Sequence, residues 1–332
     1  MAVVNEQEPL VSVVITTYNR QAYLKEAISS VVGQTYKNIE VIISDNCSTE
    51  SPKELVDAFQ DSRLHLRINE KNIGIGANFT SAFKLAKGKY VASINDDDVW
   101  QKDFLEKLVP LLENNPEVVV AFCDYYVINS DSTINEKLTE EQTKRETRAE
   151  LKAGIYQPYY KLALVDKAIF SALANVIRKD AVDWDKLASD GADASVYCDL
   201  YMTYLACRSG KAAYYCPEKL AFHRVHEQAE TMISGSKNAQ AKIRKGEAGI
   251  FCYKIFIEDP LLQEIKPYFE QELAHANTTV AIGLLRVGQV AEARPYLLNA
   301  IAAQKFNLRT LAALTLSYTP QTITRQFLGI AK

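Results

Sequence analysis

The sequence predicts an α/β fold built on an open, mostly parallel sheet with a helical C-terminal region, and two observations lead to this prediction. Short apolar, β-branched runs alternate with helical patterns through the first hundred residues, a rhythm typical of parallel α/β sheets. Polar clusters also follow the predicted strands, at residues 16–20, 45–49 and 96–98. Because ligands bind beyond the carboxyl ends of the strands in such sheets, these clusters predict a binding site.

The first strand is expected at Val11–Thr17, a β-branched run that is too short for a membrane span and suits burial on both faces. Apolar residues at helical spacing, from Leu24 to Val31, then predict a helix that continues to about Val32. The later elements repeat this alternation, with strands at 39–43, 64–68, 90–94 and 121–128 and helices at 52–59 and 79–86.

Three consecutive aspartates, Asp96, Asp97 and Asp98, end the fourth predicted strand. Carboxylates this close repel one another, so one is driven toward the protonated form unless a cation or hydrogen-bond donors lie nearby. A divalent cation that carries a phosphorylated ligand would remove the conflict, because Mg²⁺ prefers carboxylate and phosphate oxygens. The alternative is a solvated turn in which Asp98 caps a helix that begins near Trp100.

The order of three segments resembles the family 2 glycosyltransferases of the GT-A fold. The segments read VSVVITTYNR, VIISDNCSTE and NIGIGANFTSAFKLAKGKYVASINDDDVW. The resemblance covers about residues 8–230. It implies a GT-A type catalytic domain at residues 8–232, followed by a helical region at 233–332, and an enzyme that uses a nucleotide-diphosphate sugar with Mn²⁺ or Mg²⁺.

The resemblance places the base, ribose and sugar of the donor in the loops that follow the first three strands. Tyr18 would stack on the base, and Asp45 would accept a hydrogen bond from the base edge. Uracil suits this pair, although relatives with the same pattern also use GDP and dTDP sugars. The residues implied for this part of the site are Thr16, Tyr18, Asn19, Asp45, Asn72, Gly74 and Asn78.

The aspartate triplet overlies the DXD-type motif, which bridges metal and diphosphate in this family. Asn95 stands where the common motif has an aspartate, so the first carboxylate is lost. The resemblance then makes Asp97 the best metal ligand, with Asp96 facing the ribose or sugar and Asp98 close behind. A second departure is Asn46-Cys47, where Asp-Gly is more usual, and it makes the identity of the donor base less certain.

The segment Phe222–His226 (FHRVH) is expected to follow a strand. It matches an aromatic-Arg-x-His pattern of the family, which implies that Arg224 faces phosphate and that His226 binds the metal. Imidazole is a suitable ligand for Mn²⁺. His223 is a weaker candidate for the donor site.

The acceptor side requires a general base, usually Asp or Glu, to remove a proton from the acceptor hydroxyl. Asp199 fits the position at the start of a helix that the resemblance implies, with Asp193 as the alternative. The usual leading acidic pair falls on Val196 and Tyr197, so this motif is degenerate. The structural alternative for Asp199 is a first-turn carboxylate favoured by the helix dipole.

The composition limits the classes of function. A net charge of −3 gives no sign of a basic, nucleic-acid-binding face. The six cysteines include no C-x-x-C pair, which favours reduced core residues over disulfides or zinc. The N-terminal residues lack the pattern of a signal peptide, and no run of about 18 apolar residues occurs. We therefore expect a cytoplasmic enzyme.

Two regions lie outside the predicted catalytic core. Residues 131–152 are densely charged and predict a solvated loop or helix that either flanks the acceptor cleft or is a surface insertion. From residue 234 the pattern is helical, with a tetratricopeptide-like hairpin that turns at Gly288. The apolar and basic tail, residues 306–332, either packs on the catalytic domain or touches the inner face of a membrane as an amphipathic surface.

Two functions remain open at this point. The first is an inverting, hexosyltransferase-type enzyme (EC 2.4) that moves a sugar from a nucleotide-diphosphate sugar, preferably a UDP-sugar, to a glycan or lipid-linked acceptor in cell-surface polysaccharide biosynthesis. The second is a nucleotide-sugar-binding or scaffold protein with weak or no turnover, as Asn95 and the degenerate base motif suggest. A nucleotidyltransferase would require a glycine-rich phosphate loop, and TTYNRQAYL has no glycine.

Overall fold

The computed structural model of the chain describes residues 8–170, 172–229, 232–233, 238–303 and 307–319. It divides into two compact units. Unit 1 comprises Met1–Ala192 and Cys198–Val225, and unit 2 comprises Asp193–Tyr197 and His226–Lys332. Among the described residues, no helix combines the length and the apolar character that a membrane crossing requires.

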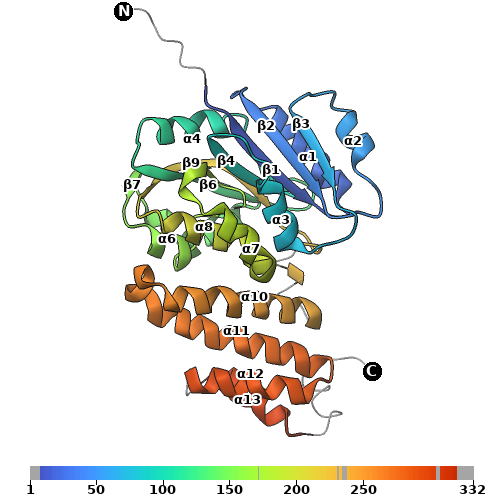
Figure 1. Cartoon of the computed structure of the whole chain (residues 1–332), viewed down its shortest axis with the longest axis vertical. Helices are drawn as coiled ribbons and strands as arrows, with labels where there is room; N and C mark the ends of the chain where they lie inside the picture. The colour runs from blue at the N-terminus through green and yellow to red at the C-terminus, as the bar shows by residue number, and fades with distance from the viewer. Residues whose placement is uncertain (1–7, 171, 230–231, 234–237, 304–306, 320–332) are drawn as a thin grey trace, which may run out of the picture. The chain divides into compact units, whose positions relative to one another are not determined.

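Unit 1 is a mixed sheet covered by helices (Figure 1). The strand order is β3-β2-β1-β4-β8-β6-β9-β5, and β7 pairs with β9. The first four strands are parallel, as predicted, while β8 lies antiparallel between β4 and β6. The strands are β1 (Val11–Thr17), β2 (Ile39–Asp45), β3 (Leu64–Ile68), β4 (Tyr90–Asn95), β5 (Val99–Trp100), β6 (Val118–Ile128), β7 (Gly154–Tyr156), β8 (Asn175–Arg178) and β9 (Ala212–Arg224).

The helices of unit 1 confirm the predicted alternation, with two differences in where they begin. Helix α3 begins at Ile75 rather than Phe79, after Gly74 with a φ of 86°, a left-handed backbone that glycine adopts without strain. Val99–Trp100 is a short strand paired with β9, so no helix begins near Trp100. The helices are α1 (Gln21–Val32), α2 (Lys53–Asp57), α3 (Ile75–Phe83), α4 (Phe104–Glu113), α5 (Glu136–Arg145), α6 (Tyr160–Leu164), α7 (Trp184–Ala194) and α8 (Cys198–Cys207).

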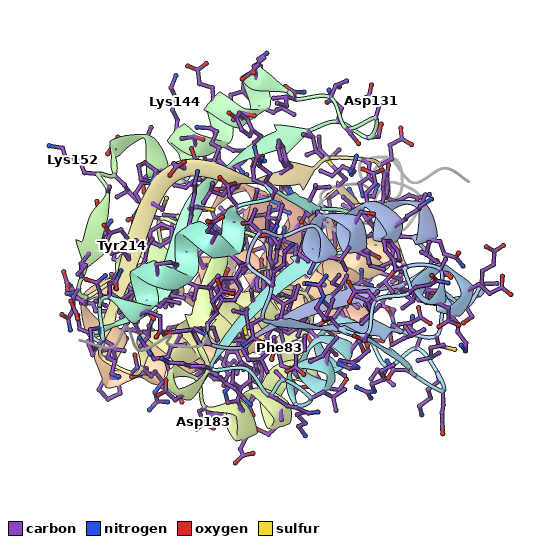
Figure 2. All side chains as sticks on the ribbon, turned by 90° about the horizontal axis from the view of Figure 1, so that it is seen from above. Phe83, Asp131, Lys144, Lys152, Asp183 and Tyr214 are labelled. Atoms are coloured by element: carbon purple, nitrogen blue, oxygen red, sulfur yellow. The ribbon has the colours of Figure 1, made fainter. Side chains whose placement is uncertain are left out.

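The core of unit 1 explains why these elements form. Val13 and Ile15 on β1 are fully buried and pack with Leu24 and Ile28 of α1. Each such side chain contributes roughly 1.5–3 kcal/mol when it is fully buried. Figure 2 shows Asp131 and Lys144 of unit 1 on the side opposite Asp183, with Phe83 in the interior. A rigid sheet therefore supports the loops at its strand ends.

Unit 2 is helical, and its helices run side by side in chain order (Figure 1). Helices α10 and α11 pack closely at Gly246 and Gly283, where an added Cβ would lie within 3.0 Å of backbone atoms of the facing helix. Gly288, with a φ of 84°, makes the turn between α11 and α12, as predicted. The helices are α10 (Ala239–Glu258), α11 (Lys266–Arg286), α12 (Val290–Ala303) and α13 (Leu308–Leu316).

The predicted amphipathic tail is described only in part. Its first half forms α13, which is tied to α11 by a hydrogen bond of 2.7 Å between the hydroxyl groups of Thr310 and Thr278. Leu308 at the start of α13 is 86% exposed. The second half of the predicted tail, residues 320–332, lies outside the described residues.

Candidate functional site

The carboxyl ends of β1, β2 and β4 lie side by side at one edge of the sheet. Thr17 pairs with Asp45 across β1 and β2, and Thr16 pairs with Asn95 across β1 and β4. The polar segments that follow these strands are therefore neighbours in space. This confirms that the three polar clusters meet, because the carboxyl ends of neighbouring parallel strands share one edge.

The first two carboxylates of the acidic turn converge on one cation. Nη1 of Arg20 lies 3.0 Å from Oδ1 of Asp96 and 2.9 Å from Oδ2 of Asp97. These aspartates are only 3% and 8% exposed. Arg20 had no assigned role in the sequence, although it ends the first polar cluster. Its guanidinium nitrogen marks a point between two acidic side chains where positive charge is favoured.

Burial perturbs the ionisation of Asp96. Desolvation, followed by repulsion from Asp97, raises the pKa of Asp96 to about 6. Arg20 opposes this rise, as does the hydroxyl group of Thr17, which donates a hydrogen bond of 2.7 Å to Oδ2 of Asp96. Asp96 and Asp97 together therefore hold more negative charge than Arg20 neutralises.

Asp98 faces β9 and is fully buried. Its Oδ1 accepts a hydrogen bond of 2.8 Å from the backbone N–H of Arg224 and lies 3.2 Å from Nδ1 of His223. Its Oδ2 accepts a bond of 3.0 Å from the side chain of Asn95. The solvated turn with Asp98 as a helix cap is therefore wrong. These contacts use Asp98 to join the turn to β9.

His223 is the histidine that contacts the acidic turn. Burial lowers the pKa of its imidazole, but the charge and hydrogen bond of Asp98 more than offset this, so the net pKa lies above its ordinary value. The sequence could have indicated this contact of His223. Side chains alternate along a strand, so residues 223 and 224 of the FHRVH segment point to opposite faces. The whole Phe222–Arg224 stretch belongs to β9, so it does not follow the strand, contrary to the expectation.

The loops after β1 and β2 are interlocked around Asp45. Asp45 is fully buried, and its carboxylate accepts hydrogen bonds from the backbone N–H and the hydroxyl group of Ser48, at 3.0 and 2.5 Å. The hydroxyl group of Ser48 accepts in turn from the backbone N–H of Asn19, at 2.7 Å. Tyr18 is 45% exposed beside this network. Its ring is thus available for stacking, while Asp45 shapes the loop.

The loop before α3 is held by asparagine side chains. Asn78 is buried, and its Oδ1 accepts from the side chains of Ser44 and Asn69, at 2.7 and 2.8 Å. Oδ1 of Asn72 accepts from the N–H of Gly74 and from the side chain of Asn46, at 2.9 and 3.0 Å. These asparagines fix the backbone of the loop. Asn46, which stands where Asp-Gly is more usual in the family, thus belongs to the hydrogen-bond network that holds this loop.

Arg224 is buried among protein groups. Its side chain donates hydrogen bonds of 2.7 Å to the carbonyl of Asp97, to the hydroxyl of Ser132 and to the carboxylate of Glu26. This orientation differs from the expectation that it faces phosphate. His226, the other residue implied from this segment, is half-buried and begins the main segment of unit 2.

The described residues contain no cluster of three or more His, Cys, Asp or Glu side chains that could hold a metal ion. The point between Asp96 and Asp97, which Arg20 marks, nevertheless fits a cation that takes other ligands from a bound molecule. Mg²⁺ is commonly held by one or two carboxylates together with substrate phosphates. Asp97, the expected metal ligand, therefore suits a divalent metal, and the geometry adds Asp96, which was expected to face the ribose or sugar.

The residues expected on the acceptor side lie on α7 and α8. Asp199 is half-buried in the first turn of α8, and its Oδ1 accepts a hydrogen bond of 2.8 Å from the N–H of Leu200. Desolvation raises the pKa of Asp199 above its ordinary value. Asp193 is exposed near the end of α7. A carboxyl group with a raised pKa is suited to accept a proton.

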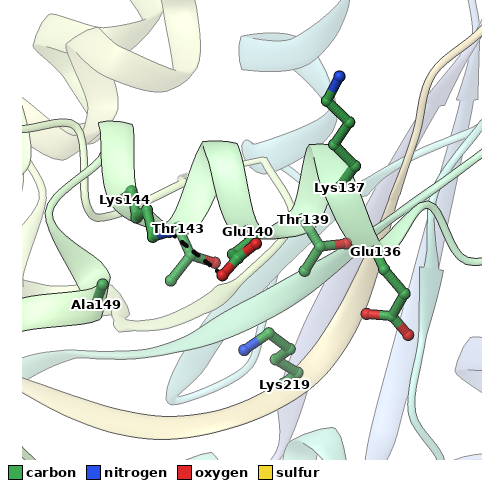
Figure 3. Close-up of a pocket in the computed structure, with 8 residues that line it drawn as sticks. All are labelled: Glu136, Lys137, Thr139, Glu140, Thr143, Lys144, Ala149 and Lys219. Carbon is green, nitrogen blue, oxygen red and sulfur yellow. Dashed lines mark hydrogen bonds and ion pairs between the residues drawn. The ribbon is translucent and has the colours of Figure 1, made fainter.

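The charged segment 131–152 forms α5 and lines a pocket of about 480 Å³ on the surface of unit 1 (Figure 3). Lys144 and Glu140 form an i,i+4 ion pair of 3.2 Å along this helix. Beneath α5, the buried Arg148 pairs with Asp124 at 2.7 Å. The lining residues are Glu136, Lys137, Thr139, Glu140, Thr143, Lys144, Ala149 and Lys219. None of these carries a role predicted for the donor site.

Comparison with solved structures shows the fold. The Staphylococcus aureus protein TarS (residues 1–349), solved in complex with UDP-GlcNAc, superposes with a TM-score of 0.63 at 16% identity, covering 96% of this chain and 91% of that one. The mannosyltransferase PcManGT of Pyrobaculum calidifontis, solved with GDP-Man and Mn²⁺, gives a TM-score of 0.55 at 19% identity, covering 97% and 87%. The mixed sheet is thus of the GT-A type.

Comparison with sequences agrees. An Escherichia coli relative, the UDP-Glc:alpha-D-GlcNAc-diphosphoundecaprenol beta-1,3-glucosyltransferase WfgD, is 32% identical over 125 residues, or 38% of this chain and 49% of that one. The chain spans about half the length of several curated relatives that it matches. The model named "Glycosyl transferase family 2" matches residues 12–173. These matches, together with the fold, show that the chain carries a glycosyl transferase family 2 domain.

Proposed function

We propose that the protein is a metal-dependent, inverting glycosyltransferase that moves a sugar from a nucleotide-diphosphate sugar, with UDP favoured, to a glycan or lipid-linked acceptor in cell-surface polysaccharide assembly. One observation carries the proposal. Asp96 and Asp97 converge on a single cation position, at 3.0 and 2.9 Å, at the sheet edge where the exposed Tyr18 also lies. Such an edge is where α/β sheets bind nucleotides.

The chemistry of the donor site follows from these side chains. Asp96 and Asp97 would hold a divalent cation, which supplies neutralising charge to the leaving diphosphate. Arg20 holds the two carboxylates in place when no metal is bound, because its Nη1 contacts both. Tyr18 would stack on the base, and Asp45 with Asn19 would set the shape of the base pocket.

The acceptor side requires a proton acceptor. Asp199 would take the proton from the acceptor hydroxyl as that oxygen attacks the anomeric carbon, with Asp193 as the alternative. The raised pKa of Asp199 supports this role, since a base works best when its pKa approaches the working pH. The bond from the anomeric carbon to the diphosphate breaks as the new glycosidic bond forms.

The identity of donor and acceptor is proposed from the comparisons. The names of relatives and neighbours refer to UDP-Glc, UDP-GlcNAc and a diphosphoundecaprenol acceptor, which supports a UDP-sugar and a lipid-linked acceptor. Because one structural neighbour was solved with GDP-Man, GDP sugars are tested as donors as well. A lipid-linked acceptor would suit a cytoplasmic enzyme that touches a membrane peripherally, and the exposed Leu308 on α13 is one residue such a contact could use.

A second candidate is a nucleotide-sugar-binding or scaffold protein with little turnover. The positions of the usual acidic pair are Val196 and Tyr197, and the ring of Tyr197 packs against Tyr253 within unit 2, with 6.2 Å between ring centroids. The chain thus has an aromatic packing residue where the family resemblance implies a carboxylate. This observation favours weak turnover without affecting nucleotide binding.

The first experiment is a thermal-shift panel of UDP, GDP, dTDP and CDP, each with and without Mn²⁺. A ligand at about a hundredfold over its Kd stabilises the native state by roughly 2.7 kcal/mol. A Mn²⁺-dependent shift for one nucleotide would support the donor site and select the sugar donors to test for transfer. The absence of any shift would contradict the proposed donor site.

Turnover then separates the two candidates. The nucleotide sugar that stabilises the protein is incubated with Mn²⁺, and released nucleoside diphosphate is measured with and without lipid-linked and glycan acceptors. Slow hydrolysis or transfer supports the enzyme. Binding without either reaction favours the scaffold protein.

A further inference from the structure

Arg224 is the last residue of β9 and is only 1% exposed. Each nitrogen of its guanidinium group has a protein partner. Nε donates to the backbone carbonyl of Asp97, Nη1 to the hydroxyl of Ser132, and Nη2 to the carboxylate of Glu26, each at 2.7 Å. The ring of Tyr23 lies 4.7 Å from the centre of the guanidinium group. The side chain is therefore oriented by three segments of unit 1: the acidic turn, the loop after β6 and α1.

Two consecutive residues of the acidic turn depend on Arg224. Its side chain binds the carbonyl of Asp97, and its backbone N–H binds the carboxylate of Asp98 at 2.8 Å. A peptide plane held at its carbonyl has little freedom to rotate, so this bond limits the directions open to the Asp97 side chain. The carboxylate of Asp97 then meets Arg20 at the cation position.

Arg224 also ties the acidic turn to the loop after β6. Its Nη1 lies 3.4 and 3.5 Å from the carbonyls of Ser130 and Asn129, besides the hydroxyl of Ser132. The same hydroxyl donates a bond of 3.1 Å to Glu26 of α1. Three elements therefore converge on one buried arginine.

We propose that Arg224 is a positioning residue that fixes Asp97 for metal and diphosphate binding, and does not itself contact the phosphate. The inference rests on the proposed donor site, and it goes further by assigning the arginine of the FHRVH segment an indirect role. Groups that orient metal ligands affect metal affinity or activity by about 10–100-fold when they are changed.

Lysine cannot replace Arg224 in this geometry. Its ammonium group is a compact point charge, whereas the planar guanidinium donates in several fixed directions at once. Arg224→Lys would keep the positive charge beside Glu26 and lose the bond to the carbonyl of Asp97 or the bond to Ser132. The variant therefore separates charge from geometry.

Arg148 supplies a matched control. It is equally buried, it pairs with Asp124 and Glu146, and it lies against the ring of Tyr125 at 4.0 Å. Arg148→Lys removes the same kind of buried guanidinium from unit 1, and its charged partners lie under α5 instead of at the acidic turn. Any loss that comes only from destabilising unit 1 should appear in both variants.

The experiment measures the affinity of UDP, with GDP in parallel, by titration calorimetry in Mn²⁺ and again in EDTA, on the full chain. We expect Arg224→Lys to weaken Mn²⁺-dependent binding by about tenfold or more and to leave binding in EDTA unchanged. Arg148→Lys should bind as the unchanged protein does, even where its melting temperature falls as far. Glu26→Gln and Ser132→Ala, which each remove one partner of Arg224, should give smaller losses of the same kind.

Three results would overturn the inference. The first is wild-type affinity in Arg224→Lys, and the second is an equal loss in Arg148→Lys. The third is an equal loss in Mn²⁺ and in EDTA, which would indicate direct phosphate binding. Metal-independent nucleotide binding, or none, by the unchanged protein would instead overturn the proposed donor site, and the positioning role with it.

Discussion

At the residue scale, the candidate site depends on how two neighbouring carboxylates are kept charged in a buried turn. Burial and the charge of Asp97 raise the pKa of Asp96, while Arg20 and Thr17 lower it. An arginine at 2.9–3.0 Å from both carboxylates gives the protein its own counter-charge. A divalent cation at this position would carry twice that charge and would in addition bind phosphate oxygens.

The first prediction concerns Asp97. Asp97→Asn keeps the size of the side chain and removes its charge, so we expect Mn²⁺-dependent UDP binding to weaken by about a hundredfold or more, beyond the range for groups outside the coordination sphere. Calorimetry with and without EDTA measures this. Asp57→Asn, at an exposed residue of α2 that pairs with Lys53, is the control. Retained metal dependence in Asp97→Asn would place the metal elsewhere.

The second prediction concerns Asp199. Asp199→Asn should leave nucleotide binding intact and lower the transfer rate by about a hundredfold or more, because the acceptor hydroxyl loses its base. The amide oxygen can still accept from Leu200, so the helix should keep its first turn. A rate within a few-fold of the unchanged protein would exclude Asp199 as the base, and Asp193→Asn would then be tested.

The pH dependence adds an independent check on Asp199. Burial raises its pKa above the ordinary value of 3.8, so the native state binds this proton more tightly than the unfolded chain does. Ionisation of Asp199 therefore lowers the stability of the native state, and Asp199→Asn should not lower the melting temperature at pH 7. Transfer by the unchanged protein should fall on the acid side as this group takes up a proton. A lower melting temperature in the variant would contradict the direction of the shift.

At the element scale, the strand ends create the site and glycines decide how closely the helices of unit 2 approach. On α10, an added Cβ at Gly246 would lie 2.9 Å from two backbone atoms of α11. At Gly249, one turn further along the helix, the nearest atoms belong to side chains at 3.2 Å. An added Cβ would thus meet backbone atoms of α11 at Gly246, but only side-chain atoms at Gly249.

The third prediction compares these glycines. Gly246→Ala should destabilise the protein by about 1–3 kcal/mol, because overpacking forces backbone shifts. Gly249→Ala should be close to neutral, since alanine favours the helix by roughly 1 kcal/mol over glycine and its nearest contacts, the Cβ of Ala276 and the ring of Tyr253, lie at 3.2 Å and require a smaller displacement. Urea unfolding followed by circular dichroism measures both. A near-neutral free energy change in both variants would show that α10 and α11 separate easily at Gly246.

Sequence patterns predicted some elements better than others, for physical reasons. Val11–Thr17 and Leu64–Ile68 were predicted with the bounds observed, because apolar runs ended by polar residues mark strands clearly. The strand Val99–Trp100 was missed, since two residues carry no periodicity and only pairing with β9 defines them. The early start of α3 depends on the left-handed backbone of Gly74, which no apolar pattern reveals.

At the scale of the whole molecule, the sequence indicated which segments meet but not how their side chains are used. The meeting of residues 16–20, 45–49 and 96–98 follows from parallel strand order. The contacts of Arg224 with Asp97 and Asp98 do not, because Arg224 lies on β9, more than a hundred residues away in the chain. The antiparallel β8 between β4 and β6 brings β9 into the same sheet. Spacing along the chain carries no information about such long-range contacts.

The last prediction maps ligand binding across unit 1 by hydrogen exchange. UDP with Mn²⁺ should slow exchange in the segments 16–20, 45–49 and 96–98, because a ligand that binds the native state suppresses local opening. The hydrogen bonds that join Asn19, Ser48 and Asp45 should make the first two segments respond together. Helix α5 serves as an internal control, since its pocket shares no residue with these loops. Protection centred on residues 136–149 would instead place the nucleotide in the α5 pocket, and the role of the acidic turn would be wrong.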